Sequence, residues 1–407
     1  MKNKSIKNKI FASALALTLT IGAFQLPSYV ANAAEPNTPQ LKIKKVLNLP
    51  ESGVSTPVEN FTFKFEKHSL NNDENKKNEL PDIQGKPAAF DAAMVTDADP
   101  ATDGKQIVKL TDDVLKGVTF DKAGQYTYRV TEIKGAKDDM TYSSASYLVS
   151  IFTKTDEHGK VVVDSIQIKK EKDDEGNTVP KANKTPYTPG TEADNGKGNE
   201  FVFNNNYDPK DGNDNLTPGE VTPGKDPVIP EVDKKGFALM KEIAGANVNV
   251  HEKFTFKITA DKPKGSHSDA QTFKCRVVSG KTVSQPKEET YGKPFDVDLK
   301  HGDRVVFSGV LLGSTVKAEE TVDGGYTKGI KAGSKINGQE VNTVEKLKTG
   351  LPIGDDKAGN FVNFVNTPQT PTGILMNHLP FIALVLAAVS GILFFVKNKK
   401  EDENAQA

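Results

Sequence analysis

A short alternating strand pattern occurs once in each half of the chain, and it constrains the fold more than any other feature. Residues 41–45 read LKIKK and residues 60–65 read NFTFKF, whereas residues 237–241 read FALMK and residues 253–258 read KFTFKI. Apolar residues at every second position are typical of strands with one face in a core. Because strand, loop and strand occur in the same order twice, the pattern indicates a duplicated β-rich unit and not a solenoid.

The segment between the two copies, residues 207–233, is rich in Asp, Asn, Gly and Pro and contains Thr-Pro-Gly twice. It lacks alternating apolar residues, so it is interpreted as a linker. The flanking units, residues 34–206 and 234–367, have an ordinary domain size. Further short strands are expected at residues 126–133, 147–153, 161–168 and 304–307. We therefore predict an all-β protein with two tandem β-sandwich domains.

Both ends of the chain carry apolar segments that do not belong to these domains. Residues 1–33 combine a lysine-rich start, an apolar stretch and a small-residue site, Ala31-Asn32-Ala33. These are the marks of a secretory signal peptide, cleaved after Ala33 or Ala34. Near the other end, residues 374–396 are apolar and long enough to cross about 30 Å of hydrocarbon, and lysines follow them. A plain single-pass anchor is one interpretation of this C-terminal segment.

Composition excludes several classes of function. Lysine and arginine total 53 against 54 acidic residues, so the chain lacks the basic excess that nucleic-acid binding requires. The six histidines are scattered without metal-ligand spacing, and no catalytic constellation appears. The single cysteine, Cys275, allows no internal disulfide and is predicted to be a buried small residue in a strand. We expect no cofactor, no metal site and no nucleic-acid partner, and we do not expect an enzyme.

Polar residues share the core-facing side of several predicted strands. Alternate side chains of a strand lie on one face, so Lys45 lies on the side of Leu41 and Ile43. The same reasoning turns Glu132 and Asn205 inward in the first unit, and Lys241 and Asn366 inward in the second. The second unit's acid is assigned to Glu320, with Glu319 as the alternative. The assignment of the inward-facing lysines and asparagines is open by one strand position, because further lysines and asparagines lie nearby: Lys44, Asn204, Asn206 and Asn363.

A lysine, a glutamic acid and an asparagine in one apolar core can react with each other. Burial disfavours charge, so it lowers the pKa of a lysine and raises that of a glutamic acid. An uncharged amine can attack the asparagine carboxamide carbon, while a protonated carboxyl polarises the carbonyl. Loss of ammonia then leaves an amide between the two side chains. Contact between the reactants supplies the entropic part of the barrier, so the reaction needs no external enzyme.

Residues 369–373 read QTPTG and stand directly before the C-terminal apolar segment and its lysines. This order resembles the cell-wall sorting signal of Gram-positive surface proteins, in which a sortase cleaves between Thr and Gly. Gln369 stands where most such motifs have Leu, as in pilin subunits. Together with the strand-ending lysines, the Val-Thr-Glu segment and the terminal Phe-x-Asn, the chain resembles the streptococcal T-antigen type of major pilin. The resemblance covers residues 35–373 and implies CnaB-type Ig-like domains.

The resemblance also implies roles for individual residues. Self-formed isopeptide bonds would join Lys45 to Asn205, assisted by Glu132, and Lys241 to Asn366, assisted by Glu320 or Glu319. A pilus-building sortase would cleave between Thr372 and Gly373 and join Thr372 to a lysine of the next identical subunit. The matching lysine is Lys197, with Lys181 and Lys184 as alternatives.

The implied setting is a covalent, cell wall-anchored pilus outside the cell, built from a precursor held transiently in the membrane. Its partners would be accessory pilins, peptidoglycan through a housekeeping sortase, and a host receptor. A wall-anchored adhesin that is never polymerised is the first alternative, and a secreted enzyme is the second.

Overall fold

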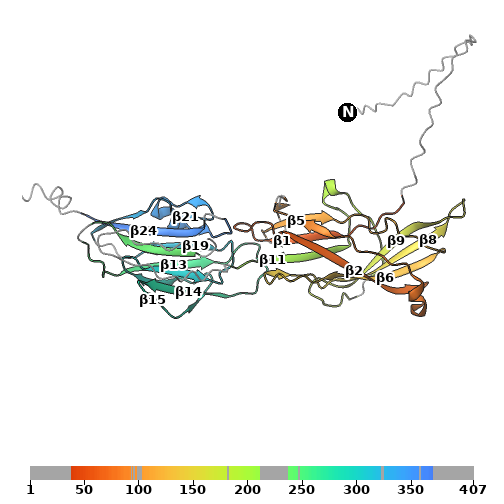
Figure 1. Cartoon of the computed structure of the whole chain (residues 1–407), viewed down its shortest axis with the longest axis horizontal. Helices are drawn as coiled ribbons and strands as arrows, with labels where there is room; N and C mark the ends of the chain where they lie inside the picture. The colour runs from red at the N-terminus through yellow and green to blue at the C-terminus, as the bar shows by residue number, and fades with distance from the viewer. Residues whose placement is uncertain are drawn as a thin grey trace, which may run out of the picture. The chain divides into compact units, whose positions relative to one another are not determined.

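The structure is a computed structural model that describes residues 38–92, 94, 97–98, 103–180, 183–210, 237–245, 248–321, 325–356 and 359–369. Within these ranges, helix is confined to α1 (Val344–Thr349) and two 3-10 turns, η1 (Glu74–Glu79) and η2 (Glu192–Asp194). Figure 1 shows the strands in two groups, one coloured red to light green and the other green to blue. The predicted all-β class is confirmed. The signal peptide, most of the linker and the C-terminal apolar segment lie outside the described residues.

Two sheets form the first domain. One has the strand order β4-β5-β1-β11-β7, and the other has the order β10-β9-β8-β6-β2-β3. The first sheet consists of β1 (Lys44–Leu49), β4 (Asp97–Ala98), β5 (Lys105–Leu110), β7 (Met140–Thr141) and β11 (Val202–Tyr207). The second consists of β2 (Glu59–Leu70), β3 (Ala88–Phe90), β6 (Gly124–Ile133), β8 (Ser146–Thr155), β9 (Val161–Lys172) and β10 (Thr185–Pro186).

Two sheets also form the second domain. The larger runs β15-β14-β18-β12-β24-β21-β22, with β16 beside β14 and β20 beside β24, and the smaller runs β17-β13-β19-β23. The larger consists of β12 (Phe237–Ile243), β14 (Thr272–Ser279), β15 (Thr282–Val283), β16 (Lys287–Thr290), β18 (Arg304–Ser308), β20 (Tyr326–Ile330), β21 (Lys335–Ile336), β22 (Gln339–Glu340) and β24 (Asn360–Pro368). The smaller consists of β13 (Phe254–Asp261), β17 (Phe295–Leu299), β19 (Thr315–Glu320) and β23 (Leu351–Pro352).

In each domain the first long strand pairs in parallel with the last. In the first domain β1 lies beside β11 with Lys45 opposite Phe203. In the second, β12 lies beside β24 with Lys241 opposite Phe364. The two registers are equivalent, because Asn205 and Asn366 each lie two residues beyond the phenylalanine opposite the lysine. Residues two apart on a strand share a face, so each asparagine points to the same side as its lysine.

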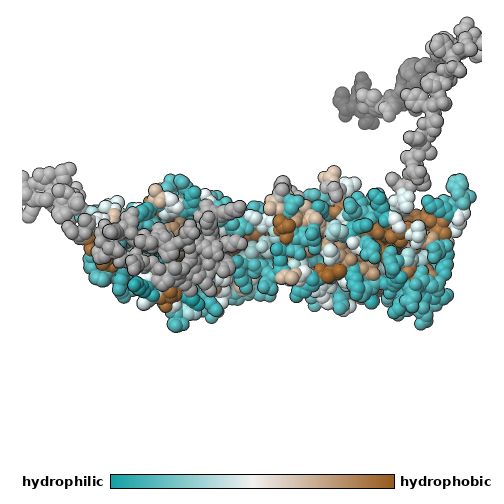
Figure 2. Space-filling view, viewed as in Figure 1, coloured by the Kyte–Doolittle hydropathy of each residue, from teal (hydrophilic) through white to brown (hydrophobic). Residues whose placement is uncertain are grey.

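Each domain encloses its own apolar core between its sheets. Aromatic pairs connect the sheets: Phe63 and Phe203 have ring centroids 5.0 Å apart, and Phe256 and Phe364 have centroids 5.1 Å apart. Full burial of one such side chain stabilises a fold by roughly 1.5–3 kcal/mol. Figure 2 shows a mainly hydrophilic surface over the coloured residues, as expected when the apolar faces pack inward.

The strands predicted at residues 126–133, 147–153, 161–168 and 304–307 fall within β6, β8, β9 and β18. The predicted first strand differs, because regular strand geometry starts at Lys44 although Leu41 and Ile43 are fully buried. Side chains replace the backbone acceptors there: the backbone N–H of Leu41 donates to Asp113 Oδ1 at 2.9 Å, and that of Ile43 to Thr111 Oγ1 at 2.9 Å. Burial fixes the direction of these residues before the strand begins.

Burial along β12 exceeds what its alternation predicts. All seven residues of this strand are buried, including those on the side away from Lys241. On that second side, Ala238 packs with Val278 and Val306 in a small separate cluster. The strand is therefore covered on both faces, and Glu242 is buried as well.

Candidate crosslinking sites

Three polar side chains meet inside the first domain. Lys45 comes from β1, Glu132 from β6 and Asn205 from β11. The Lys45 Nζ donates to Glu132 Oε2 at 2.7 Å, and the Asn205 Nδ2 donates to Glu132 Oε1 at 2.6 Å. The side chains of Lys45 and Glu132 are 0% exposed, and Asn205 is 0% exposed. The carboxyl group thus bridges the lysine nitrogen and the asparagine nitrogen in a fully buried position.

The surroundings of Lys45 are apolar except for its direct partners. Its Nζ lies 4.6 Å from the ring centroid of Phe61 and donates to the backbone oxygen of Phe203 at 3.2 Å. Burial lowers the pKa of Lys45 from 10.5 to about 8, although Glu132 opposes the shift. Burial likewise raises the pKa of Glu132. Both shifts bring the pair closer to the uncharged form that the chemistry needs.

The second domain contains the equivalent cluster. The Lys241 Nζ on β12 donates to Glu320 Oε2 at 2.7 Å, and the Asn366 Nδ2 on β24 donates to Glu320 Oε1 at 2.9 Å. Burial lowers the pKa of Lys241 to about 8. Its Nζ lies 4.3 Å from the ring centroid of Phe254 and 4.7 Å from that of Phe364. Lysine, acid and asparagine therefore meet in an aromatic setting in both domains.

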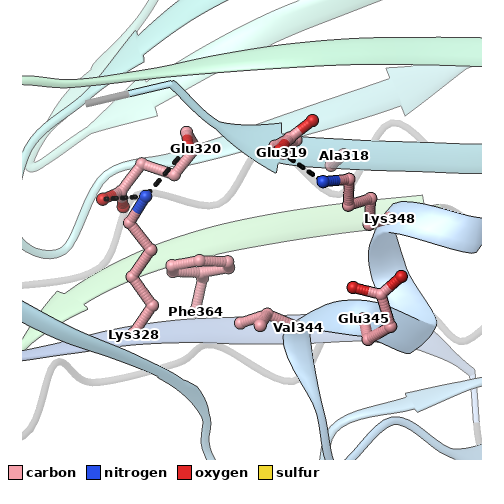
Figure 3. A pocket seen from close by; sticks show the side chains of 8 residues that line it. All are labelled: Ala318, Glu319, Glu320, Lys328, Val344, Glu345, Lys348 and Phe364. Carbon is pink, nitrogen blue, oxygen red and sulfur yellow. Dashed lines mark hydrogen bonds and ion pairs between the residues drawn. The ribbon is translucent and has the colours of Figure 1, made fainter. Parts of the chain in front are cut away.

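Glu320, and not its alternative Glu319, is the acid of the second cluster. The side chains of Glu319 and Lys348 are each 53% exposed and form an ion pair at 2.9 Å. Figure 3 shows this pair on one side of a cavity of about 130 Å³, with Glu320 and Lys328 on the other side. Lys328 Nζ lies 4.0 Å from Glu320 Oε1 and donates to the Glu320 backbone oxygen at 3.1 Å.

The other residues that left the assignment open do not enter these clusters. Lys44 and Asn204 alternate with Lys45 and Asn205 along their strands and so face the other way. The Oδ1 of Asn206 accepts a hydrogen bond from Asn48 Nδ2 at 2.9 Å. Asn363 lies on the opposite face of β24 from Asn366.

Asn363 belongs to a third group that the sequence analysis did not identify. Its Nδ2 donates to Glu242 Oε2 at 2.6 Å, and Lys331 Nζ donates to the two oxygens of Glu242 at 3.1 and 3.0 Å. The Lys331 side chain is 34% exposed, so its ammonium keeps contact with water. We interpret this group as an ion pair with a hydrogen-bonded amide. The signal that could have found it is Glu242 directly after Lys241 in an apolar strand.

The residues expected to join subunits are only partly described. Lys197 is exposed in a turn in which its backbone N–H donates to Asp194 O at 3.1 Å. Asn195 and Gly196 adopt positive φ angles of 53° and 66° there. Lys184 is exposed as well. Lys181, Thr372 and Gly373 lie outside the described residues.

The described residues offer no arrangement of three or more His, Cys, Asp or Glu side chains that could hold a metal ion. Among the same residues, no helix is long and apolar enough to cross a membrane. Cys275 is 4% exposed in β14, which confirms the prediction that it is buried in a strand.

Sequence comparison assigns the two domains separately. Residues 41–208 match the family described as "Spy0128-like isopeptide containing domain". Residues 235–367 match a family described as "Domain of unknown function (DUF7601)". A protein named "Pilin" from Streptococcus pyogenes serotype M1 is 22% identical over 369 residues, which cover 89% of this chain and 92% of that protein.

Similar solved structures include two major pilins of Streptococcus pyogenes. One is 18% identical and covers 82% of this chain and 99% of its own, with a TM-score of 0.30. The other, T3.2, is 18% identical and covers 81% and 98%, with a TM-score of 0.32. Residues 41–208 are similar to the Spy0128-like isopeptide containing domain family, and over most of its length the chain is similar to a streptococcal pilin.

Proposed function

We propose that the chain is a structural pilus subunit whose two domains each form an internal Lys–Asn amide bond. The observation that carries this proposal is the pair of buried clusters in equivalent registers, Lys45 with Glu132 and Asn205, and Lys241 with Glu320 and Asn366. The similarity to a protein named "Pilin" supports the structural role.

The reaction is the same in both domains. The uncharged lysine Nζ attacks the asparagine Cγ, and a C–N bond forms. The bond from Cγ to Nδ2 breaks, and the nitrogen leaves as ammonia. The glutamic acid contacts both nitrogens, so it can take the proton that Nζ loses and give a proton to Nδ2. Atoms balance without a cofactor, and the enclosing fold holds the reactants in contact.

Polymerisation is the second part of the proposal. A pilus-building sortase cleaves between Thr372 and Gly373 and transfers the Thr372 carbonyl to Lys197 of the next subunit. The exposure of Lys197 in a tight turn fits a nucleophile that a large enzyme must reach. The product is a covalent fibre outside the cell, carrying accessory pilins and attached to peptidoglycan by a housekeeping sortase, and it supports adhesion to a host receptor.

A cell wall-anchored adhesin that is not polymerised is the alternative. The internal bonds would form in the same way, but Thr372 would end on peptidoglycan. Wall extracts analysed by denaturing electrophoresis separate the two proposals, because a polymer gives a ladder and a monomeric anchor gives a single species.

The intramolecular chemistry is tested by mass. The full chain, expressed without a sortase, should weigh less than its sequence by two ammonias, about 17 Da each. Digestion should yield one peptide pair that joins Lys45 to Asn205 and another that joins Lys241 to Asn366. An undiminished mass in a folded protein would remove the proposed bonds.

A further inference from the structure

The two asparagine oxygens lie in different environments. In the first domain, the backbone N–H of Ser143 donates to Asn205 Oδ1 at 2.7 Å. A backbone N–H can only donate, so the atom facing it must be the carboxamide oxygen. The Nδ2 of Asn205 is thereby turned to Glu132. In the second domain, Asn366 Oδ1 is buried and has no hydrogen-bond partner among the described residues.

Strand β7 explains why Ser143 is available. This strand pairs with β11 only through Met140 and Thr141, opposite Tyr207 and Asn206. Residues 142–145 then leave the ladder, and the N–H of Ser143 points to a side chain instead of a strand. In the second domain, β20 continues along β24 and places Lys328 opposite Asn366.

Asp174 holds the departing segment against β11. Its Oδ1 accepts from the Ser143 hydroxyl at 2.5 Å and from the backbone N–H of Asn204 at 2.9 Å. Its Oδ2 accepts from Asn204 Nδ2 at 2.9 Å, and its backbone oxygen accepts from the N–H of Ser144 at 2.8 Å. Burial favours a raised pKa for Asp174, but the hydrogen bonds from Asn204 and Ser143 outweigh it and hold the pKa below its usual value. The charged Asp174 side chain therefore connects Ser143 to Asn204, the residue directly before the reacting asparagine.

We propose that the Ser143 backbone N–H is an oxyanion donor for the Lys45–Asn205 bond and that Asp174 is its positioning residue. This inference rests on the proposed isopeptide chemistry. When Lys45 Nζ adds to Asn205 Cγ, negative charge develops on Oδ1, and the N–H of Ser143 stabilises it. As Cγ–Nδ2 breaks, the charge returns to the carbonyl and ammonia leaves.

The assignment changes the role of Glu132 from the one expected from the sequence. Its carboxyl group lies on the nitrogen side of the Asn205 amide, so it relays a proton and does not polarise the carbonyl. Among the described residues of the second domain, no hydrogen-bond donor reaches the matching oxygen, Asn366 Oδ1. The Lys45–Asn205 bond should therefore form faster than the Lys241–Asn366 bond, by a factor on the order of 100, the effect typical of one oxyanion donor.

The test follows both bonds in one molecule. The full chain is pulse-labelled with heavy amino acids in cells without a sortase, chased, and digested after denaturation at each time. The two crosslinked peptide pairs are then quantified. Ser143→Ala removes the hydroxyl that Asp174 holds and should slow the first bond about tenfold, since a misplaced donor loses part of its effect. Ser143→Thr keeps a hydroxyl and should restore the rate. The second bond is the internal control in every sample.

Asp174→Asn separates positioning from charge. The negative charge of Asp174 acts against the burial that lowers the pKa of Lys45. Loss of this charge alone would leave more of Lys45 uncharged and would speed formation of the first bond. Loss of the positioning of Ser143 would slow formation of the same bond. We expect the first bond to slow in this variant. Melting in a Lys45→Ala background, where no first bond can form, shows whether Asp174→Asn still leaves the domain folded at the assay temperature.

The outcomes are distinguishable. If neither bond forms in the wild-type chain, the proposed function fails. If both form at the same rate, and folded Ser143→Ala and Asp174→Asn variants keep the wild-type rate of the first bond, the function stands and the oxyanion assignment is overturned. A first bond that accelerates in Asp174→Asn also overturns the positioning role.

Discussion

The bond between Lys45 and Asn205 should account for a large part of the stability of the first domain. It closes a loop of about 160 residues, and the chain-entropy relation for crosslinks gives about 5 kcal/mol for a loop of that size. For a domain of this length, about 5 kcal/mol corresponds to a melting temperature change of roughly 10–20 °C.

The double substitution Lys45→Met with Glu132→Gln measures this contribution. It removes the nucleophile and the buried charges together. The glutamine side chain introduced by Glu132→Gln can still accept a hydrogen bond from Asn205 Nδ2. The mass deficit relative to the variant's own sequence should shrink by about 17 Da, the ammonia that is no longer lost. Calorimetry should show the first domain melting roughly 10–20 °C lower.

Glu132→Gln alone should be worse than the double substitution. It blocks the bond but leaves Lys45 buried at 0% exposure without its acid. Because the usual pKa of a lysine is 10.5, keeping this amine uncharged at pH 7 costs about 4–5 kcal/mol more. Glu66→Gln, at an exposed ion pair with Lys64, is the matched control and should change stability by less than about 0.5 kcal/mol.

A double variant, Lys45→Met with Glu132→Gln, that retains its ammonia yet melts within roughly two or three degrees of the wild type would refute the reasoning.

Three further predictions concern the acid, the pH and the fibre. Glu320→Ala should abolish only the second bond, whereas Glu319→Ala should leave both bonds and the deficit of two ammonias unchanged; peptide mapping that gives the reverse would contradict the cluster geometry. The Lys45–Asn205 bond should form at a nearly constant rate around neutral pH and more slowly above about pH 8. Above that pH, Lys45 and Glu132 together lose the single proton that they share, so no protonated acid remains to give a proton to Asn205 Nδ2. A rate that keeps rising to pH 9.5 would show that the carboxylate form of Glu132 suffices for the reaction. Lys197→Arg should remove the polymer ladder and Lys184→Arg should not; an unchanged ladder in the first variant would move the intersubunit linkage to another lysine.

The clusters could be predicted because period-two alternation carries the information. Lys241 shares a strand face with Phe237 and Leu239, and Asn366 shares one with Phe364, so local spacing alone turns both inward. The parallel pairing of first and last strands then places them together. Alternation with Val316 and Ala318 favoured Glu320 but left Glu319 open; the burial of the Glu320 side chain and the exposure of the Glu319 side chain decide it.

The environment of the asparagine oxygen could not be predicted from the sequence. Ser143 acts through a backbone N–H, which every residue except proline possesses, so its identity carries no signal. Asp174 is about 30 residues from both partners and lies in a polar turn that looks like many others in this chain. Its effect depends on β7 ending after two residues, and strand ends are the least predictable features of a sequence.

The parallel pairing of the first and last strands also limits how far a pulled domain can lengthen. In the proposed fibre, tension crosses the second domain from β12 to β24, and these two strands pair in parallel. In the crosslinked domain, the covalent path passes from Lys241 straight to Asn366. The intervening chain of about 125 residues, which would extend by roughly 400 Å if it unravelled, is excluded from that path. In the first domain the path runs only from Lys197 to β11, and the Lys45–Asn205 bond ties the end of this short segment to β1. The contour length contributed by these domains is then set by how many subunits have been joined, and tension does not change it.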